Sequence, residues 1–223
     1  MKLQVVAFDF DGTLVDSTPG IVRCMERTVA ALGLPPETAK AWSELIGLPV
    51  ADQLRRVLPP ERRGEVDEGA ALYRSFYLQL SEAELGRPFP GIAELLEALG
   101  GRVRLAIATS KSLRGVQRAL RNFGWESLFD PVVTPERVAR PKPHPESLHS
   151  IIAQHGVAPG SAVFVGDSRF DIEMACAARV PGWGVGWGVH PCSALAAAGA
   201  ARCFLTPSEL RAAILDSLPG KGP

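Results

Sequence analysis

Apolar residues along this chain form two kinds of pattern. Short apolar runs at 5–8, 103–108 and 162–165, of which the second contains Arg104, predict strands that are buried on both faces, as in a parallel sheet covered by helices. Helical stretches at 92–99 and 113–123 alternate with the later runs. This alternation predicts an α/β core built on a doubly wound parallel sheet. Further strands are expected at 131–133, 183–187 and 203–205, and further helices at 145–155, 171–178 and from 207 onward.

The stretch from residue 17 to residue 85 has helical spacing without strand-like runs. Two apolar stripes recur at intervals of three and four residues, and we interpret them as packing faces of two helices. Breaks rich in Gly and Pro divide the remainder into shorter helices. We therefore expect a small α-helical cap at 17–85, inserted into a catalytic core of residues 1–16 and 86–223. The stripes consist of Ile21, Met25, Val29 and Leu32, and of Val66, Ala70, Tyr73, Tyr77 and Leu80.

Carboxylates follow the first apolar run directly, in the segment VVAFDFDGTLVDS. Asp9 and Asp11 stand where a buried strand should end, and burial of a carboxylate is costly unless it is paired or bound to a metal. Ligand sites in open α/β sheets lie outside the carboxyl ends of the strands. Thr109 and Asp167 follow two later runs in the same way. These positions predict one functional site at that edge of the sheet.

The residue types at these positions suit phosphoryl transfer. Asp9 can attack phosphorus as a nucleophile, and Asp11 can give a proton to the leaving group and later activate water. Hard oxygen ligands from Asp9, the Asp11 backbone carbonyl and Asp167 suit Mg²⁺, which is the implied cofactor. Lys142 adds positive charge, and Asp171, one helical turn after Asp167, either ligates the metal or orients Lys142. Phosphate binding is expected from Thr109, Ser110 and Lys142.

Four segments in order resemble the motifs of the haloacid dehalogenase-like superfamily: DFDGTLVDS, AIATSKS at Thr109, RPKPHPE at Lys142, and VFVGDSRFDIEMA at Asp167 and Asp171. The helical insert is similar to the cap of the subgroup that includes phosphoglycolate phosphatases. The resemblance implies a Rossmann-like core and hydrolysis of a small phosphate monoester, with 2-phosphoglycolate as the favoured substrate, through an aspartyl-phosphate. Many members of that subgroup carry Asn where this chain has Ser110, and this departure leaves the substrate open.

Other activities remain open on the same core. A pyrophosphatase, a nucleotide phosphatase or a sugar-phosphate mutase would use the same residues, and a non-catalytic phosphate- or partner-binding module would use the same fold. Asp11 argues against the dehalogenase branch, which lacks an acid/base Asp at this position. A phosphonoacetaldehyde hydrolase needs a Schiff-base lysine in the cap, where the one lysine between Gly12 and Leu85 is Lys40, in a polar setting.

The overall charge indicates a small-molecule partner. Lys plus Arg and Asp plus Glu number 24 each, so the formal net charge is zero and no bulk field favours nucleic acid or an anionic membrane. We expect a small phosphorylated metabolite as the partner, no nucleic acid and no membrane, while the oligomeric state stays open. The apolar stretches are too short to span a bilayer and no signal-peptide pattern precedes the first strand, so a cytoplasmic location is expected.

Cysteines and glycines add two minor expectations. Cys24, Cys176, Cys192 and Cys203 are widely spaced without a CxxC pair, which favours reduced thiols and no structural metal. Glycines at 184, 186 and 188 lack a helix directly after them, so we interpret them as a permissive strand and turn near the site.

Overall fold

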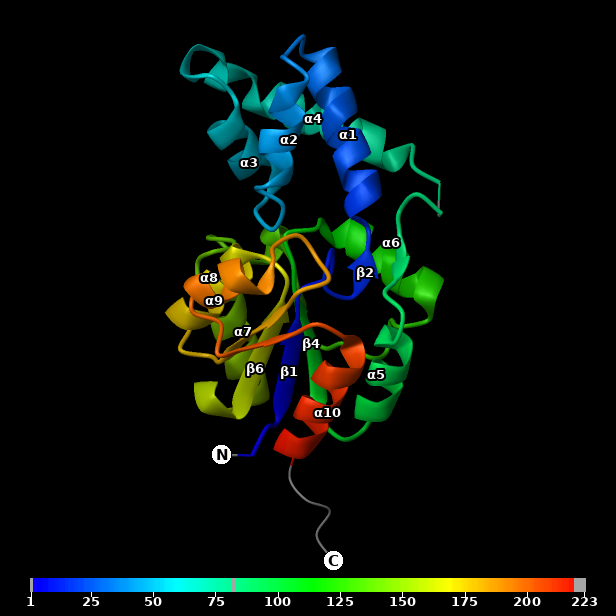
Figure 1. Ribbon diagram of the computed structural model, residues 1–223, viewed down its shortest axis with the longest axis vertical. Coiled ribbons are helices and arrows are strands. Elements are labelled where there is room, and N and C mark those ends of the chain that lie inside the picture. The colour runs from blue at the N-terminus through cyan, green and yellow to red at the C-terminus, as the bar shows by residue number, and fades with distance from the viewer. Residues whose placement is uncertain (1, 82, 219–223) are drawn as a thin grey trace, which may run out of the picture.

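The computed structural model describes residues 2–81 and 83–218. Its centre is a six-stranded sheet in the order β5-β4-β1-β6-β7-β8, in which every neighbouring pair of strands is parallel (Figure 1). This topology confirms the predicted doubly wound α/β fold. The strands are β1 (Val5–Phe8), β4 (Arg104–Ala108), β5 (Val132–Val133), β6 (Ala162–Gly166), β7 (Gly182–Val185) and β8 (Arg202–Phe204).

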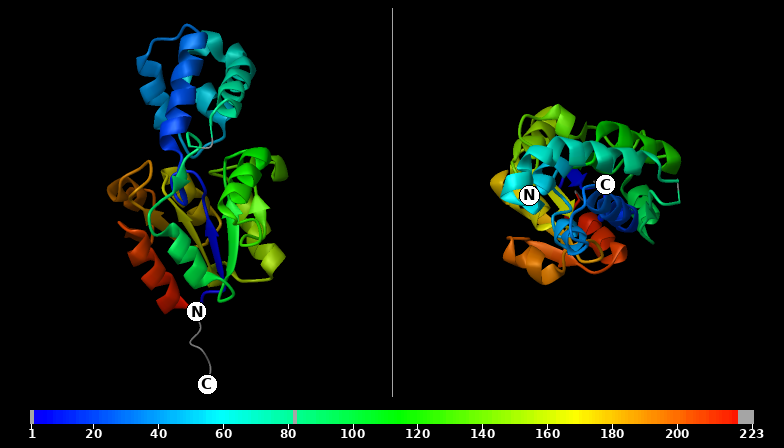
Figure 2. Two further views of the ribbon diagram at one scale, coloured as in Figure 1. Left: turned by 90° about the vertical axis from the view of Figure 1, so that its right-hand side faces the viewer. Right: turned by 90° about the horizontal axis from the view of Figure 1, so that it is seen from above.

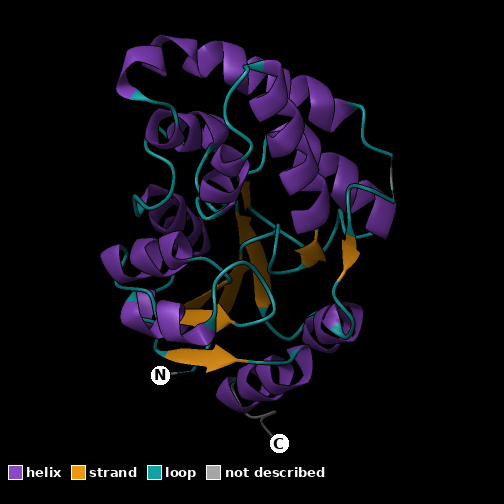
Figure 3. Ribbon diagram, turned by 45° about the horizontal axis from the view of Figure 1, so that its top comes forward, coloured by secondary structure: helices purple, strands orange, loops and turns teal. Residues whose placement is uncertain are grey.

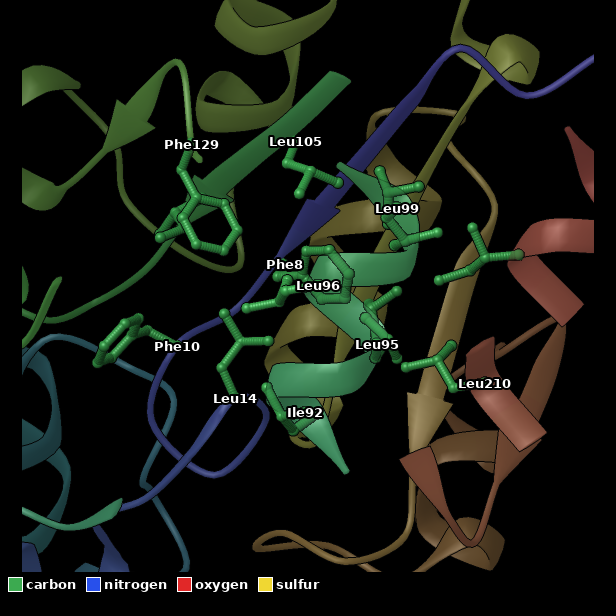
Figure 4. Packing of buried hydrophobic residues seen from close by; sticks show 14 of the residues in the cluster. Phe8, Phe10, Leu14, Ile92, Leu95, Leu96, Leu99, Leu105, Phe129 and Leu210 are labelled. Carbon is green, nitrogen blue, oxygen red and sulfur yellow. The ribbon is translucent and has the colours of Figure 1, made fainter. Parts of the chain in front are cut away.

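Helices cover both faces of this sheet (Figure 3). Because successive side chains of a strand point to opposite faces, Val6 and Phe8 of β1 join one buried cluster and Val5 and Ala7 join another. In the first cluster α5 packs its leucines against Phe8 and against α10 (Figure 4). The core helices are α5 (Ile92–Leu99), α6 (Leu113–Phe123), α7 (Glu146–His155), α8 (Arg169–Ala177), α9 (Cys192–Ala197) and α10 (Pro207–Ser217).

The segment expected to be helical forms its own layer above the sheet (Figure 2). Its helices bury a separate hydrophobic cluster around Trp42, Leu54 and Tyr73. A buried hydrogen bond from Trp42 Nε1 to Gln53 Oε1, 2.6 Å long, joins two of the helices inside this cluster. Both predicted stripes contribute buried residues to it. The elements are α1 (Thr18–Ala31), α2 (Glu37–Ser43), α3 (Val50–Val57), the 3₁₀ helix η1 (Pro60–Glu65) and α4 (Val66–Leu78).

Two chain segments connect the helical layer to the sheet layer. They pair as a short antiparallel ladder, β2 (Val15–Asp16) with β3 (Arg87–Pro88), which the apolar pattern did not indicate. Further short 3₁₀ turns are η2 (Pro135–Arg137) and η3 (Pro159–Ser161). The ladder holds the two crossings side by side.

The expectation that all four cysteines are reduced thiols is wrong. Cys192 and Cys203 form a disulfide that joins the start of α9 to β8, with their Cα atoms 5.9 Å apart, while Cys24 and Cys176 are free. The two are 11 residues apart in the sequence, and the α9 crossover folds back so that its beginning meets the next strand. Spacing alone did not show this approach.

Within the described residues, 2–81 and 83–218, no helix combines the length and the apolar character that crossing a membrane would require.

Candidate functional site

The candidate residues meet where neighbouring strands end. Asp9 follows β1, Thr109 follows β4 and Asp167 follows β6, and β1 lies between the other two strands in the sheet. The carboxyl ends of these parallel strands point toward the helical layer (Figure 1). The arrangement is the one expected for a ligand site in an open α/β sheet.

Lys142 reaches this point from the loop before α7. Its Nζ donates hydrogen bonds to Asp9 Oδ1 at 2.6 Å and to Asp171 Oδ1 at 2.7 Å, and its side chain is 2% exposed. Burial lowers the pKa of Lys142, but attraction to Asp171 and Asp9 outweighs burial and leaves the pKa raised. Lys142 is therefore a fixed positive charge in direct contact with Asp9.

A second face of the cluster is formed by Asp167. Its Oδ1 accepts a hydrogen bond from Thr13 Oγ1 at 2.9 Å, and its Oδ2 accepts one from the Val189 backbone N–H at 2.8 Å. One carboxylate oxygen each from Asp9, Asp167 and Asp171 lies within 4.8 Å of the others, and all three residues are buried. These distances fit a cation held by hard oxygen ligands.

Burial, with a contribution from neighbouring carboxylates, raises the pKa of Asp9 and of Asp167. Burial is the largest cause for Asp9, whose pKa rises to about 7 although Lys142 opposes the shift. Burial also raises the pKa of Asp167 well above its usual value, and the charges of Asp171 and Asp9 add to this effect. A cation between these acids would relieve both the desolvation and the repulsion.

Asp171 occupies both of its oxygens inside the protein. While Oδ1 accepts from Lys142, Oδ2 accepts from the backbone N–H of Ser168 at 2.9 Å and from its hydroxyl at 2.6 Å, in the capping box that begins α8. Of the two roles left open for Asp171, this geometry supports the orientation of Lys142.

Asp11 points to a different partner, Lys111, which the sequence analysis did not include. Lys111 Nζ donates to the two carboxylate oxygens of Asp11 at 2.8 and 3.0 Å, and Ser17 Oγ donates to Oδ1 at 2.6 Å. Burial lowers the pKa of Lys111, but the charge of Asp11 and the contact with Tyr77 outweigh it and raise the pKa. The sequence offered one sign that Lys111 belongs to the site, since it lies two residues after Thr109 in the same strand-end loop.

Thr109 and Ser110 lie at the junction of β4 and α6. Thr109 is buried, and its Oγ1 accepts a hydrogen bond from the Lys111 backbone N–H at 3.1 Å. Ser110 Oγ donates to the backbone carbonyl of Gly47 at 2.7 Å, which connects the core to the loop between α2 and α3. Thr109 thus follows the strand next to the one that Asp9 follows, whereas the Ser110 hydroxyl faces the helical layer.

The glycine-rich segment after β7 passes close to the acids, as its pattern indicated. A Cβ at Gly188 would collide with Asp167 and with the Gly12 carbonyl. The next residue, Val189, supplies the backbone donor to Asp167. The absence of a side chain at Gly188 therefore lets this loop close one side of the site.

Comparison with known proteins agrees with the geometry. The family model described as "Haloacid dehalogenase-like hydrolase" matches residues 6–185. The chain is 36% identical to "Probable phosphatase IndB" of Dickeya dadantii, over 87% of this chain and 86% of the relative. It is 30% identical to a phosphoglycolate phosphatase of Shigella boydii, over 99% of this chain and 93% of the relative.

A solved structure shows the same fold. A hydrolase of the haloacid dehalogenase-like family from Streptococcus pneumoniae superposes with a TM-score of 0.80 at 27% identity, covering 95% of this chain and 98% of the other. The family match and the named phosphatases confirm the predicted enzyme class, a phosphoric monoester hydrolase. The chain belongs to the haloacid dehalogenase-like hydrolase family.

Proposed function

We propose that this protein is a Mg²⁺-dependent phosphatase that hydrolyses a small phosphate monoester through a phosphorylated Asp9. The observation that carries this proposal is the environment of Asp9. Its carboxylate is buried, contacts the Lys142 ammonium at 2.6 Å, and lies among carboxylates that fit a cation. Asp11, two residues further on, supplies a second carboxylate for proton transfer.

In the first step an Asp9 carboxylate oxygen bonds to phosphorus while the bond between phosphorus and the leaving oxygen breaks. Asp11 gives its proton to that leaving oxygen, so the alcohol departs neutral. In the second step Asp11 takes a proton from water, whose oxygen bonds to phosphorus as the Asp9–phosphorus link breaks. Inorganic phosphate leaves, Asp9 is restored and Asp11 holds its proton again.

Phosphoryl oxygens carry negative charge throughout both steps, and nearby donors would bind them. Lys142 offers an ammonium next to Asp9, and the Thr109 hydroxyl offers a further donor, with Ser110 beside it. The Leu113 and Gly115 amides at the start of α6 already donate to Glu136 and Ser112. Asp171 keeps Lys142 in place through its 2.7 Å contact. These roles remain proposals that mutation can test.

The charges of the site fit a divalent cation. Four carboxylates face two lysines, so full ionisation leaves two negative charges for a bound ion to offset. Asp9, Asp167 and the backbone carbonyl of Asp11 would hold Mg²⁺, which would act as a Lewis acid toward the transferring phosphoryl group. The groups counted are Asp9, Asp11, Asp167, Asp171, Lys111 and Lys142.

We further propose that residues 17–85 act as a cap that closes over a core of residues 1–16 and 86–223. Gly47 supports this assignment, because its carbonyl accepts a hydrogen bond from Ser110 and its Cα lies so close to Ser168 that a Cβ would collide with it. A cap seated in this way excludes water from the reacting groups and limits the size of the leaving alcohol. A small phosphorylated metabolite, with 2-phosphoglycolate as the favoured candidate, follows from that limit and from the named relatives.

The experiment measures phosphate release from a panel of phosphate esters with Mg²⁺ and with chelator, using wild type and Asp9→Asn. We expect turnover in Mg²⁺ that falls by three orders of magnitude or more in Asp9→Asn, because the amide is a far weaker nucleophile. Asp216→Asn, an exposed position on α10, is the matched control and should behave as wild type. Undiminished turnover in Asp9→Asn would sink the covalent route, and silence across the panel in folded protein would favour a binding module.

A further inference from the structure

Lys111 is a buried ammonium at the boundary between the core and the cap. Its side chain is 6% exposed, although a lysine at a loop between strand and helix would ordinarily reach water. Its Nζ lies 4.8 Å from the ring centre of Tyr77 on α4 and 5.7 Å from that of Phe10. Asp11 is its carboxylate partner. Burying an ammonium in this way is costly, which favours a functional reason for its placement.

The two buried lysines differ in what they are free to bind. Lys142 is held between Asp9 and Asp171. Its ammonium would therefore face the transferred phosphoryl group. Lys111 contacts Asp11, the residue that in the proposed mechanism meets the leaving oxygen. Lys111 is thus the cation on the leaving-group side of the reaction.

The distances place Lys111 within reach of a substituent on the leaving alcohol. An oxygen that hydrogen-bonds to the Asp11 carboxylate lies within about 6 Å of Nζ, because two successive hydrogen bonds of about 2.8 Å separate them. In a 2-phosphorylated hydroxy acid one carbon atom joins the ester oxygen to the carboxylate. That carboxylate can therefore contact the ammonium while the ester oxygen contacts Asp11.

The closed cap makes such a contact necessary for an anionic leaving group. The loop at Gly47 rests on Ser110 and Ser168, and Tyr77 covers Lys111 from the far end of the same layer. A carboxylate enclosed there loses its hydration and needs a charged donor from the protein. A neutral alcohol has no corresponding need.

We infer that Lys111 is a specificity-determining residue that selects phosphate esters whose leaving alcohol carries a carboxylate next to the ester carbon. The inference rests on the proposed function and adds to it the substrate class and the residue that recognises it. An ammonium has three donors, and those of Lys111 are directed at the two Asp11 oxygens and at Tyr77. Lys111 binds the substrate carboxylate with the N–H that otherwise meets Tyr77, while it keeps its contact with Asp11.

The test compares two esters that differ in that one group, 2-phosphoglycolate and ethyl phosphate, by kcat/KM in Mg²⁺. In Lys111→Gln we expect the preference for phosphoglycolate over ethyl phosphate to fall by about tenfold to a hundredfold, the size of a lost charge-assisted hydrogen bond. Lys111→Arg should retain part of the preference because it keeps the charge. Ser17→Ala is the matched control, because it removes the 2.6 Å hydrogen bond to Asp11 and leaves the cation. It should lower kcat/KM for both esters by a similar factor.

Several results would overturn the inference without touching the proposed phosphatase activity. One is a wild type that does not prefer phosphoglycolate to ethyl phosphate. Another is a Lys111→Gln variant whose kcat/KM falls equally for both esters, since this would mean that Lys111 only positions Asp11. If wild type releases phosphate from no ester, the proposed function fails. Binding then decides about Lys111: titration calorimetry with the same two esters in Asp9→Asn should show weaker phosphoglycolate binding after Lys111→Gln. Unchanged binding would refute the role of Lys111.

Discussion

Buried charge dominates this protein at the scale of single residues. Lys142 offsets part of the charge of Asp9, yet the pKa of Asp9 still rises to about 7 because burial outweighs that attraction. Without a cation, Asp9 therefore holds a proton below about pH 7, and its proposed roles as nucleophile and ligand both require the release of that proton. The structure couples the chemistry of Asp9 to whatever positive charge enters the cluster.

The raised pKa of Asp9 predicts how stability depends on pH. The folded state holds a proton on Asp9 between its ordinary pKa, 3.8, and about 7, whereas the unfolded state releases it, so the free energy of unfolding falls as pH rises through this interval. Asp167 acts in the same direction. Mg²⁺ needs the ionised carboxylates, so we expect it to raise the melting temperature more at pH 7.5 than at pH 5.5.

The melting temperature is measured in chelator and in Mg²⁺, at pH 5.5 and at pH 7.5. The increase caused by Mg²⁺ at one pH is then compared with the increase at the other. The lowered pKa of His190, caused by burial and Arg169, gives a slope of opposite sign below about 6.5, and the difference between the two conditions removes it. An Mg²⁺ effect that is equal at both pH values, or larger at pH 5.5, would contradict the prediction.

At the scale of elements, short loops bring the helical layer onto the strand ends. The loop between α2 and α3 contacts both the β4 end, through Ser110, and the start of α8, through Ser168. Gly47 allows this contact because it has a φ of +110° and no side chain. The fit of one loop thus decides how closely the two layers meet.

Gly47→Ala should impair catalysis more than folding. The new Cβ would collide with Ser168, so we expect kcat/KM to fall by at least tenfold as the cap seats less closely. Gly33→Ala is the matched control, because Gly33 also has a positive φ, +62°, but has open space where its Cβ would lie. It shares a positive φ without the collision, and its φ lies within the left-handed region that L residues can adopt. Equal losses of kcat/KM in the two variants would assign the effect to strain and contradict the proposed seating of the loop.

The Cys192–Cys203 disulfide acts at the same scale by joining α9 to β8. A closed loop of this size, from a separation of 11 residues, is expected to stabilise the protein by about 2 to 3 kcal/mol through the unfolded chain. The Cys192→Ser and Cys203→Ser double variant, or wild type in a dithiol reductant, should lose that amount in denaturant unfolding. Cys176→Ser, which removes a free exposed thiol, should leave the midpoint unchanged. If the reductant does not lower the stability of the wild type, the stabilising role of the disulfide is refuted.

At the scale of the whole molecule, two layers with separate hydrophobic clusters meet at the site. The buried residues of the cluster around Leu54 all lie in the helical layer, and Val189 of the core packs against them. The cluster around Leu96 joins the sheet to its covering helices (Figure 4). The layers are joined by the β2–β3 ladder, by contacts around Gly47 and Tyr77, and by Arg56 of α3, which lies over the Phe170 ring of α8. Each layer can therefore respond separately to a loss of packing.

Leu54→Ala and Leu96→Ala test this separation. Each side chain is almost fully buried, so each truncation should cost about 2 to 5 kcal/mol. We expect Leu54→Ala to raise amide hydrogen exchange mainly in α1 to α4 and Leu96→Ala to raise it throughout the core. Uniform acceleration across both layers in Leu54→Ala would show that they unfold as one unit.

The sequence by itself determined the strands of the six-stranded sheet, the main helices and the positions of Asp9, Thr109 and Asp167, but not the β2–β3 ladder. Apolar runs and helical spacing are local patterns, and the helices expected at 92–99 and 113–123 have the bounds of α5 and α6. Parallel strands all end at one edge of a sheet, so residues that follow different strands come together without any detailed knowledge of packing. The roles assigned to these residues stay predictions.

Tertiary structure alone decided which side chains are partners. The pairing of Lys111 with Asp11 spans 100 residues, and the contact of Gly47 with Ser110 spans 63, so neither leaves a periodic signal in the chain. The disulfide likewise depends on how the α9 crossover returns to β8. Such contacts depend on the packing of whole layers against one another, and local hydrophobic pattern determines which face of an element is buried but not what it is buried against.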